Sequence, residues 1–164
     1  MRYAKHFERA QGWLLLDKCE EAVAALAEIP ASCCLSPEVV RFRAELHMTA
    51  QEWALAEPVL RQLLEADAGE PQHWISLAFA VRRAKSIAEA EVILNDAREK
   101  FPKIALIWFN LACYSAQQNR LAEAQRLLGE ALRLQPALRE TARTDPDLAP
   151  YWKALAAGEI LPAP

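Results

Sequence analysis

The sequence predicts an all-α protein, a solenoid of four antiparallel helix pairs that is closed by capping helices at its C-terminal end. Two observations predict this fold class. Alanine, leucine, glutamate and arginine are abundant, and the 164 residues include only 4 glycines, which favours helix. In addition, Trp74 recurs as Trp108 and Pro102 recurs as Pro136, both after 34 residues, a period typical of repeat arrays.

Three columns of this repeat hold one residue type in all four copies, and chance does not explain three such columns in a single register. Two of the columns are alanine and the third is leucine. They are Ala10, Ala44, Ala78 and Ala112; Ala22, Ala56, Ala90 and Ala124; and Leu26, Leu60, Leu94 and Leu128.

The spacing within the fourth unit predicts two helices joined by a tight turn. Trp108, Leu111 and Ala112 lie on one face of the first helix, and the second helix carries a small residue at Ala124. Small residues let two helix axes approach closely, and the large residues fill the space beside them. Pro136 then stops the second helix.

This pattern resembles the tetratricopeptide repeat, whose signature has large, small and proline residues at these positions. The third and fourth units match it closely, whereas the first two depart from it at Arg9, Ile29, Cys34, Arg43, Leu63 and Ala68. The resemblance implies a right-handed superhelical α-solenoid in one domain, 1–157, with a flexible tail at 158–164. The expected units are 3–36, 37–70, 71–104 and 105–138, with capping helices at about 137–157.

Turn and cap signals indicate the helix boundaries. Ser36 followed by Pro37 is a typical helix start, with the serine as N-cap and the proline in the first turn. Pro58 falls inside the second helix of the second unit, where it predicts a kink or a lost hydrogen bond. Capping-box spacing occurs in two pairs, Asp17 with Glu20 and Ser86 with Glu89.

After Pro136 the period ends, and the remaining residues predict the capping helices. A short helix is expected near 137–143, and a second one after Asp145 with Pro146 in its first turn. Four apolar side chains share one face of this second helix and would close the apolar end of the array. They are Leu148, Tyr151, Trp152 and Leu155.

Charge and apolar pattern limit the classes of partner. A net charge of −3 argues against nucleic-acid binding, which usually needs a basic surface. No stretch reaches the roughly 20 apolar residues that span a membrane, and the first residues show no signal-type apolar region. The four cysteines form no CxxC pair, so we expect apolar filler in a reducing cytoplasm. A redox role of the adjacent Cys33 and Cys34 stays open.

The sequence contains no recognisable catalytic or metal-binding motif. It has no glycine-rich phosphate loop and no HExxH, and His6, His47 and His73 fall at unrelated positions of the repeat. We therefore expect no enzyme activity, no metal and no cofactor.

The surface that remains for function is the inner wall of the array, formed by the first helices. Positions of the repeat are counted from residues 3, 37, 71 and 105, where the four expected units begin. Positions 2, 5, 9 and 12, which lie in the first helix of each unit, face away from the tryptophan and alanine side, with position 6 at the rim. This wall is apolar, which predicts a groove for a partner segment; alternatively, its side chains pack first helix against first helix. The candidate groove residues are Phe7, Gln11, Arg41, Phe42, Glu45, Met48, Gln72, Ile75, Phe79, Arg82, Leu106, Phe109 and Asn110.

The groove predicts a protein or peptide partner, with no nucleic acid and no membrane. Arg41, Arg82 and Arg83 at its edge would anchor an acidic group. Some relatives grip a C-terminal carboxylate with lysine and asparagine at positions 5 and 9. Because Phe7 and Gln11 occupy those positions in the first unit, we do not carry this activity over.

The leading hypothesis is a cytoplasmic adaptor, chaperone or assembly subunit that binds a peptide or helix of a partner. Two others stay open. One is a chaperone similar to those of type III secretion, which holds an export substrate in its groove. The other is a self-associating structural protein, a homodimer in which a second copy covers the apolar wall or the C-terminal helix.

Overall fold

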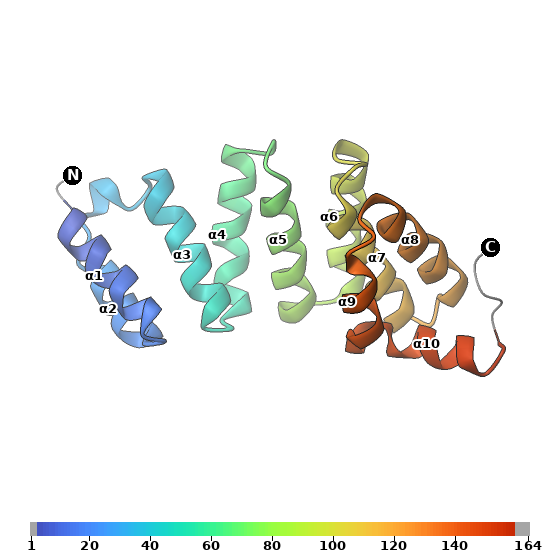
Figure 1. Cartoon of the computed structure of the whole chain (residues 1–164). Coiled ribbons are helices and arrows are strands. Elements are labelled where there is room, and N and C mark those ends of the chain that lie inside the picture. The colour runs from blue at the N-terminus through green and yellow to red at the C-terminus, as the bar shows by residue number, and fades with distance from the viewer. Residues whose placement is uncertain (1–2, 160–164) are drawn as a thin grey trace. The chain divides into compact units, whose positions relative to one another are not determined.

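The computed structural model describes residues 3–159, and all regular elements in this part of the chain are helical (Figure 1). The predicted all-α class is confirmed. Most of the predicted tail, 160–164, lies outside the described residues. The chain divides into two compact units, Met1–Ser86 and Ile87–Pro164, called unit 1 and unit 2. Repeats one and two lie in unit 1 and repeat four lies in unit 2, whereas the third repeat contributes one helix to each.

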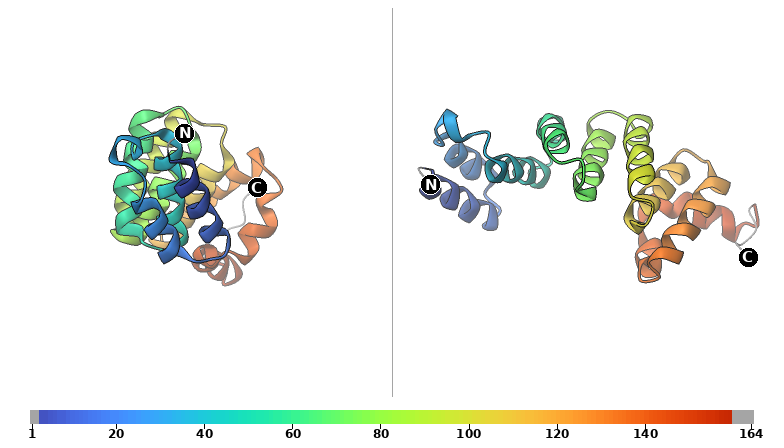
Figure 2. Two further views of the ribbon diagram at one scale, coloured as in Figure 1. Left: turned by 90° about the vertical axis from the view of Figure 1, so that its left-hand side faces the viewer. Right: turned by 90° about the horizontal axis from the view of Figure 1, so that it is seen from above.

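The described part of unit 1 contains five α-helices, which pack against their neighbours along the chain (Figure 1 and Figure 2). Helix α1 packs on α2, α3 packs on α4, and α4 also packs on α5. A short 3₁₀ turn, Ala31–Cys33, links the first pair to the second. The helices are α1 (Ala4–Leu15), α2 (Cys19–Ala27), α3 (Pro37–Thr49), α4 (Trp53–Ala66) and α5 (Pro71–Ala84).

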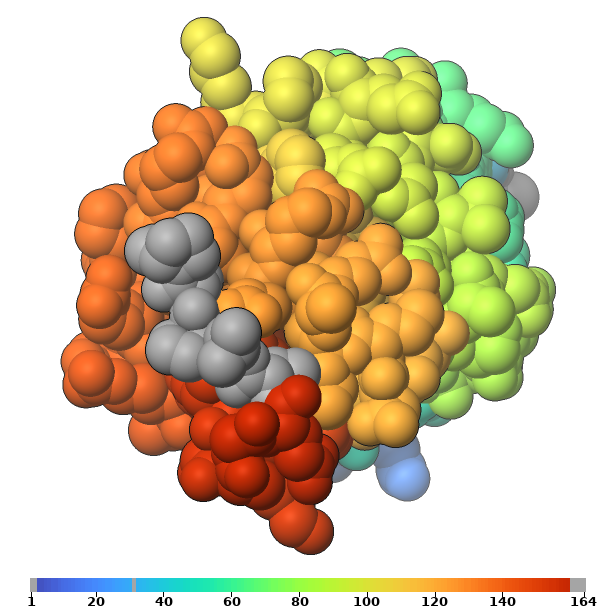
Figure 3. Space-filling view, turned by 90° about the vertical axis from the view of Figure 1, so that its right-hand side faces the viewer, coloured from blue at the N-terminus to red at the C-terminus, as the bar shows by residue number. Residues whose placement is uncertain are grey.

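Unit 2 is built around the hairpin of α7 and α8, against which the last elements pack. In the space-filling view of Figure 3, the red atoms of α10 lie against the orange atoms of the preceding helices. Helices α9 and α10 lie close to the positions where the capping helices were expected. The elements are α6 (Ile87–Lys100), α7 (Ala105–Gln117), α8 (Leu121–Leu134), α9 (Leu138–Thr144), the 3₁₀ turn Pro146–Leu148 and α10 (Ala149–Ala156).

The residues of the three constant columns are all buried, in both units. Ala112 on α7 and Ala124 on α8 are fully buried in their hairpin. Because a methyl side chain keeps the helix axes close, no larger group fits between them without moving the backbone. The constant columns of the repeat therefore mark positions that are buried where paired helices pack.

The tryptophans at position 4 of the repeat have a second role besides packing. The indole of Trp74 donates a hydrogen bond to the carbonyl of Ala68 at 3.1 Å, and Trp108 donates to the carbonyl of Pro102 at 2.8 Å. Both acceptors are the residue at position 32 of the preceding repeat. Each indole thus fixes the end of one repeat to the first helix of the next.

The turns inside the repeats depend on a residue with positive φ. Asp17, Gln51 and Asn119 have φ of 58°, 57° and 59°, and all three stand at position 15. The next amide bonds back to the end of the first helix, as from Arg120 to the carbonyl of Ser115 at 2.8 Å, which satisfies a terminal carbonyl. In the third repeat, Lys85 occupies this position with φ of −133°.

The capping predictions are confirmed only in part. Helix α3 begins at Pro37 as predicted, but the hydroxyl of Ser36 makes no cap bond; it accepts a hydrogen bond from the Tyr3 hydroxyl at 3.0 Å. The capping box at Asp17 is wrong, because Lys18 is the N-cap of α2 and Asp17 forms the left-handed turn.

Pro58 does not end its helix. Helix α4 continues through it to Ala66, although a proline has no N–H to donate to the carbonyl of Ala54.

The arginines that replace leucine in the first two repeats make polar contacts instead of core contacts. Arg9 on α1 forms an ion pair with Glu28 after α2, and this pair lowers the pKa of Glu28. The guanidinium of Arg43 donates to the carbonyl of Cys34 at 3.4 Å. Both side chains therefore join neighbouring elements without being buried.

In each compact unit, a glutamate at position 21 of a repeat, on its second helix, contacts a cationic side chain of the next repeat. In unit 1, Glu57 accepts hydrogen bonds from Lys85 at 2.8 Å and from Arg61 at 2.9 Å. In unit 2, Glu91 accepts a hydrogen bond from Arg120 at 2.6 Å, and this contact raises the pKa of Arg120. Lys85 and Arg120 stand at positions 15 and 16 of the following repeat, in the turn between its two helices.

Overpacking the α7–α8 crossing tests the packing. We expect Ala112→Leu to lower the free energy of unfolding by about 1–3 kcal/mol, because the site is fully enclosed. Ala122→Leu, at an exposed position of α8, is the control and should change it little. Urea denaturation followed by circular dichroism measures both, and equal stability of the two variants would contradict the predicted crossing.

The Glu57 cluster predicts a pH dependence of stability. Hydrogen bonds from Lys85 and Arg61 lower the pKa of the buried Glu57 below its usual 4.5, against the opposing effect of burial. As pH falls below 4.5, the unfolded chain therefore takes up the proton first, and the stabilisation present at neutral pH is lost.

Glu57→Gln should accordingly lower the urea midpoint of unfolding at pH 7. The difference in midpoint between this variant and the wild type should become smaller as pH falls below 4.5. Glu65→Gln, at an exposed position of the same helix, is the matched control. A gap for Glu57→Gln that stays constant with pH would rule out this role of the carboxylate.

Candidate functional site

Two adjoining hollows open on the surface of unit 1 and together form what we call the unit 1 groove. The first hollow has a volume of about 470 Å³ and lies between α1 and α3. The second has a volume of about 340 Å³ and lies between α3, α4 and α5. Glu45 and Thr49 of α3 line both hollows, so the groove is continuous across this helix.

Each hollow has an apolar floor and a more polar rim. The ring of Phe42 forms part of the first floor, and Ala44, Leu60 and Leu63 contribute to the second; all four are buried. The full lining of the first hollow is Gln11, Leu14, Leu15, Phe42, Glu45 and Thr49. The second is lined by Arg41, Ala44, Glu45, Met48, Thr49, Leu60, Leu63, His73 and Ser76.

The groove brings together five of the predicted residues, Gln11, Arg41, Phe42, Glu45 and Met48. Positions 5, 9 and 12 of α3 therefore do face an open surface. This follows from helical periodicity, since residues three and four apart share a face.

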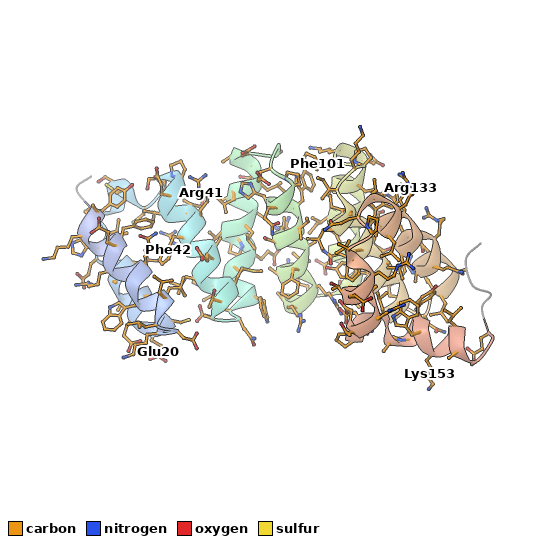
Figure 4. The ribbon with its side chains drawn as sticks, viewed as in Figure 1. Glu20, Arg41, Phe42, Phe101, Arg133 and Lys153 are labelled. Atoms are coloured by element: carbon orange, nitrogen blue, oxygen red, sulfur yellow. The ribbon has the colours of Figure 1, made fainter. Side chains whose placement is uncertain are left out.

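Three predicted groove side chains are interior residues, which corrects the picture of an exposed apolar wall. Phe42 is 6%, Ile75 is 8% and Phe109 is 4% exposed. Phe42 packs edge-on against Phe7, with ring centroids 5.3 Å apart, and Figure 4 shows it on the side of α3 that faces α1. For Phe42 the alternative interpretation, packing of one first helix against another, therefore applies, and Ile75 and Phe109 are buried within their own units.

Two further predicted side chains are half-buried. Phe7 lies between Tyr3 and Phe42, and its ring centroid is 6.2 Å from that of Tyr3. The ring of Phe79 packs against Trp53 at 5.4 Å, and the guanidinium of Arg83 lies over it at 5.1 Å. These rings stabilise unit 1, and neither lines a hollow described above.

The remaining predicted residues lie outside the two hollows. Gln72 at the start of α5 donates a side-chain hydrogen bond to Ser76 at 3.1 Å, and Arg82 near the end of α5 is half-buried. Leu106 and Asn110 belong to α7 of unit 2, where Leu106 is exposed and Asn110 is half-buried.

Sequence reasoning left several lining residues out of the candidate set. Leu15 and Thr49 stand at position 13, one helical turn beyond position 9 on the same face. Extending that stripe by four residues would have found both. His73 and Ser76 reach the second hollow because α5 packs beside α4, which no local pattern indicates.

Two charged side chains of the groove have no partner within residues 3–159. Neither Glu45 nor Arg41 makes an ion pair or a side-chain hydrogen bond there, and both are exposed. They stand four residues apart on α3, where Figure 4 shows Arg41 near its N-terminal end. Opposite charges without partners on a binding surface are available to a ligand.

The described residues contain neither a metal-binding cluster nor a membrane-spanning helix. Within 3–159, no three His, Cys, Asp or Glu side chains come together as a metal site would require. None of the helices in that range has the length and apolar character needed to cross a membrane.

The family model of the tetratricopeptide repeat matches residues 105–138. This match coincides with the fourth predicted repeat, which contains α7 and α8. No curated protein is a sequence match for the chain.

Solved structures of low sequence identity share the fold. MamA, residues 41 to the end, from Desulfovibrio magneticus RS-1 is 14% identical with a TM-score of 0.69, over 96% of this chain and 95% of that one. PilW, titled a widely conserved type IV pilus biogenesis factor, is 18% identical with a TM-score of 0.63, over 98% and 80%. The TPR2B domain of yeast Sti1, in a complex with pHsp70, is 19% identical with a TM-score of 0.61, over 73% and 96%.

Two substitutions on α7 separate interior from surface positions. We expect Phe109→Glu to lower the free energy of unfolding by at least about 3 kcal/mol, because it removes a buried ring and places a charge in the core. Leu106→Glu, at an exposed position three residues earlier, should leave the melting temperature nearly unchanged. Thermal unfolding by circular dichroism checks both variants. A Phe109→Glu variant as stable as the wild type would contradict the interior position of this ring and place it among the candidate groove residues.

Proposed function

We propose that this chain, whose residues 105–138 match the tetratricopeptide repeat and whose fold is similar to the TPR2B domain of yeast Sti1, is a protein–protein interaction module. Its unit 1 groove binds a peptide segment or helix of a partner protein. The observation that carries the proposal is the groove itself, two solvent-accessible hollows with apolar floors that adjoin at Glu45 and Thr49 of α3.

The dimensions of the groove suit side chains of a peptide. Each hollow falls within the roughly 300–1,000 Å³ of typical ligand sites, but both are open and shallow, with exposed residues along the rim. An extended or helical segment would place alternate or turn-spaced apolar side chains on the floors, while its backbone and polar groups meet the rim.

We propose the role of an adaptor, chaperone or assembly subunit in the cytoplasm, without catalytic activity. The four cysteines are free thiols, which suits a reducing compartment. Among the structural relatives, the Sti1 domain is solved in a complex with pHsp70, which gives the same fold a protein-binding example.

A second candidate is self-association through the end of α1, giving a homodimer. Leu15 and Leu16 are 88% and 65% exposed, and such apolar side chains at the end of a helix favour contact with another protein surface. Light scattering after gel filtration tests this second candidate. A dimer that Leu15→Ser converts to a monomer supports self-association, and a strict monomer rejects it.

Blocking the groove tests the main proposal. Thr49 is exposed, ends α3 and lines both hollows, so Thr49→Trp should fill them without removing a core contact. A phage library of random dodecapeptides is selected on the immobilised protein, and enriched peptides are synthesised with a fluorophore for anisotropy titration.

We expect Thr49→Trp to weaken binding of these peptides by about tenfold or more. Thr141→Trp, at an exposed position of α9 in unit 2, is the matched control and should bind as the wild type does. Equal melting temperatures exclude unfolding as the cause. The proposal fails when no peptide is enriched, or when enriched peptides bind Thr49→Trp as tightly as the wild type.

A further inference from the structure

The first hollow combines an apolar surface with one negative charge. Its apolar part consists of Leu14, Leu15 and the edge of Phe42, and its neutral polar part of Gln11 and Thr49. Glu45 is the single ionisable residue among these lining side chains. A ligand that enters this hollow therefore meets apolar surface and a carboxylate at the same place.

The carboxylate of Glu45 is unsatisfied by the protein itself. Within residues 3–159 it forms no ion pair and no side-chain hydrogen bond. Arg41, one turn away on α3, lines the second hollow and does not line the first. In contrast, the carboxylate of Glu57 on the neighbouring helix is paired with both Arg61 and Lys85. Glu45 therefore combines a carboxylate without a protein partner with a place in the lining of the groove.

From this arrangement we infer that the unit 1 groove selects a peptide segment in which an apolar side chain stands beside a lysine or arginine. The apolar side chain fills the first hollow, and the cationic group pairs with Glu45. This inference rests on the proposed function and adds the chemistry of the partner to it.

Three physical arguments favour a basic residue at this place. An acidic side chain would be repelled by Glu45, so the hollow discriminates by charge. Lysine and arginine have long apolar stems, which can lie on Leu14 and Leu15 while the charged group reaches the carboxylate. Bound apolar groups also exclude water from the pair, which strengthens its attraction relative to an open surface pair.

The second hollow does not give the same selection. Arg41, Glu45 and His73 all line it, so groups of both signs are present and no single charge on a ligand is preferred. We therefore place charge selectivity at the first hollow and assign the second hollow to apolar contacts made by the rest of the segment.

The test uses the peptides selected from the random dodecapeptide library whose binding is lost in Thr49→Trp. We expect these peptides to be enriched in lysine or arginine next to an apolar residue. One such peptide is then synthesised in three forms, with lysine, alanine or glutamate at the basic position. Wild-type protein should bind the lysine form about tenfold more tightly than the glutamate form, and this ratio should fall at high salt.

A charge exchange supplies the sharper result. Glu45→Lys should reverse the preference, so that the glutamate form binds more tightly than the lysine form. Glu65→Lys makes the same change at an exposed position of α4 outside both hollows, and it should keep the wild-type preference. Leu14→Ser should weaken all three forms but keep the order of their affinities, since it removes apolar surface and leaves the charge of Glu45 in place.

The outcomes separate this inference from the function on which it rests. Peptides that depend on Thr49 but show no basic enrichment, or whose preference Glu45→Lys leaves unchanged, overturn the selectivity while the groove keeps its role. The absence of any Thr49-dependent peptide overturns both.

Discussion

The close approach of helices at alanine is the constraint on which both units depend. The alanines of the two constant columns are buried in every copy of the repeat, because a methyl group is the largest side chain that such a crossing accepts. This constraint also decides what the other positions do. Large side chains cannot lie at the crossing, so they fill the spaces beside it or reach the next helix along the chain.

Packing of this kind is weakly directional, and polar contacts at fixed positions of the repeat supply orientation. The indoles of Trp74 and Trp108 bond to the carbonyl that ends the preceding repeat. Glu57 and Glu91, at one position of successive second helices, bind a cation in the turn that follows. These contacts are specific in distance and angle, and each lies inside its own unit. They set how one helix pair meets the next, which apolar contact alone leaves variable.

The groove is the surface that remains after this packing is satisfied. Aromatic rings that face the inner side of α1 and α3 are used to join the helices, as Phe7 and Phe42 do, so little apolar area is left open. What stays accessible is a set of shallow floors with polar and charged residues around them. A site of this composition obtains affinity from apolar side chains of a ligand and selectivity from its charges. The unpaired Glu45 gives this selectivity a definite sign.

The sequence by itself determined the all-α class, the 34-residue period and most helix boundaries, because helix formation and helix crossing depend on residue types at short, regular spacings. It also indicated which stripe of α3 faces outward, since Arg41, Glu45 and Met48 follow from periodicity alone. The left-handed turns at Asp17, Gln51 and Asn119 were not predicted: aspartate and asparagine favour that conformation by residue type, but Gln51 has no such preference, so the three turns share no residue pattern.

Only the tertiary structure decided which side chains of the predicted wall are covered. Periodicity fixes the direction of a side chain relative to its own helix, but burial depends on what another helix brings to the same place. Phe79 meets Trp53 and Phe7 meets Phe42, residues separated by tens of positions in the chain. The pairing of Glu57 and the absence of a partner for Glu45 are decided in the same way, because an ion pair depends on distance in space and not on spacing in the sequence.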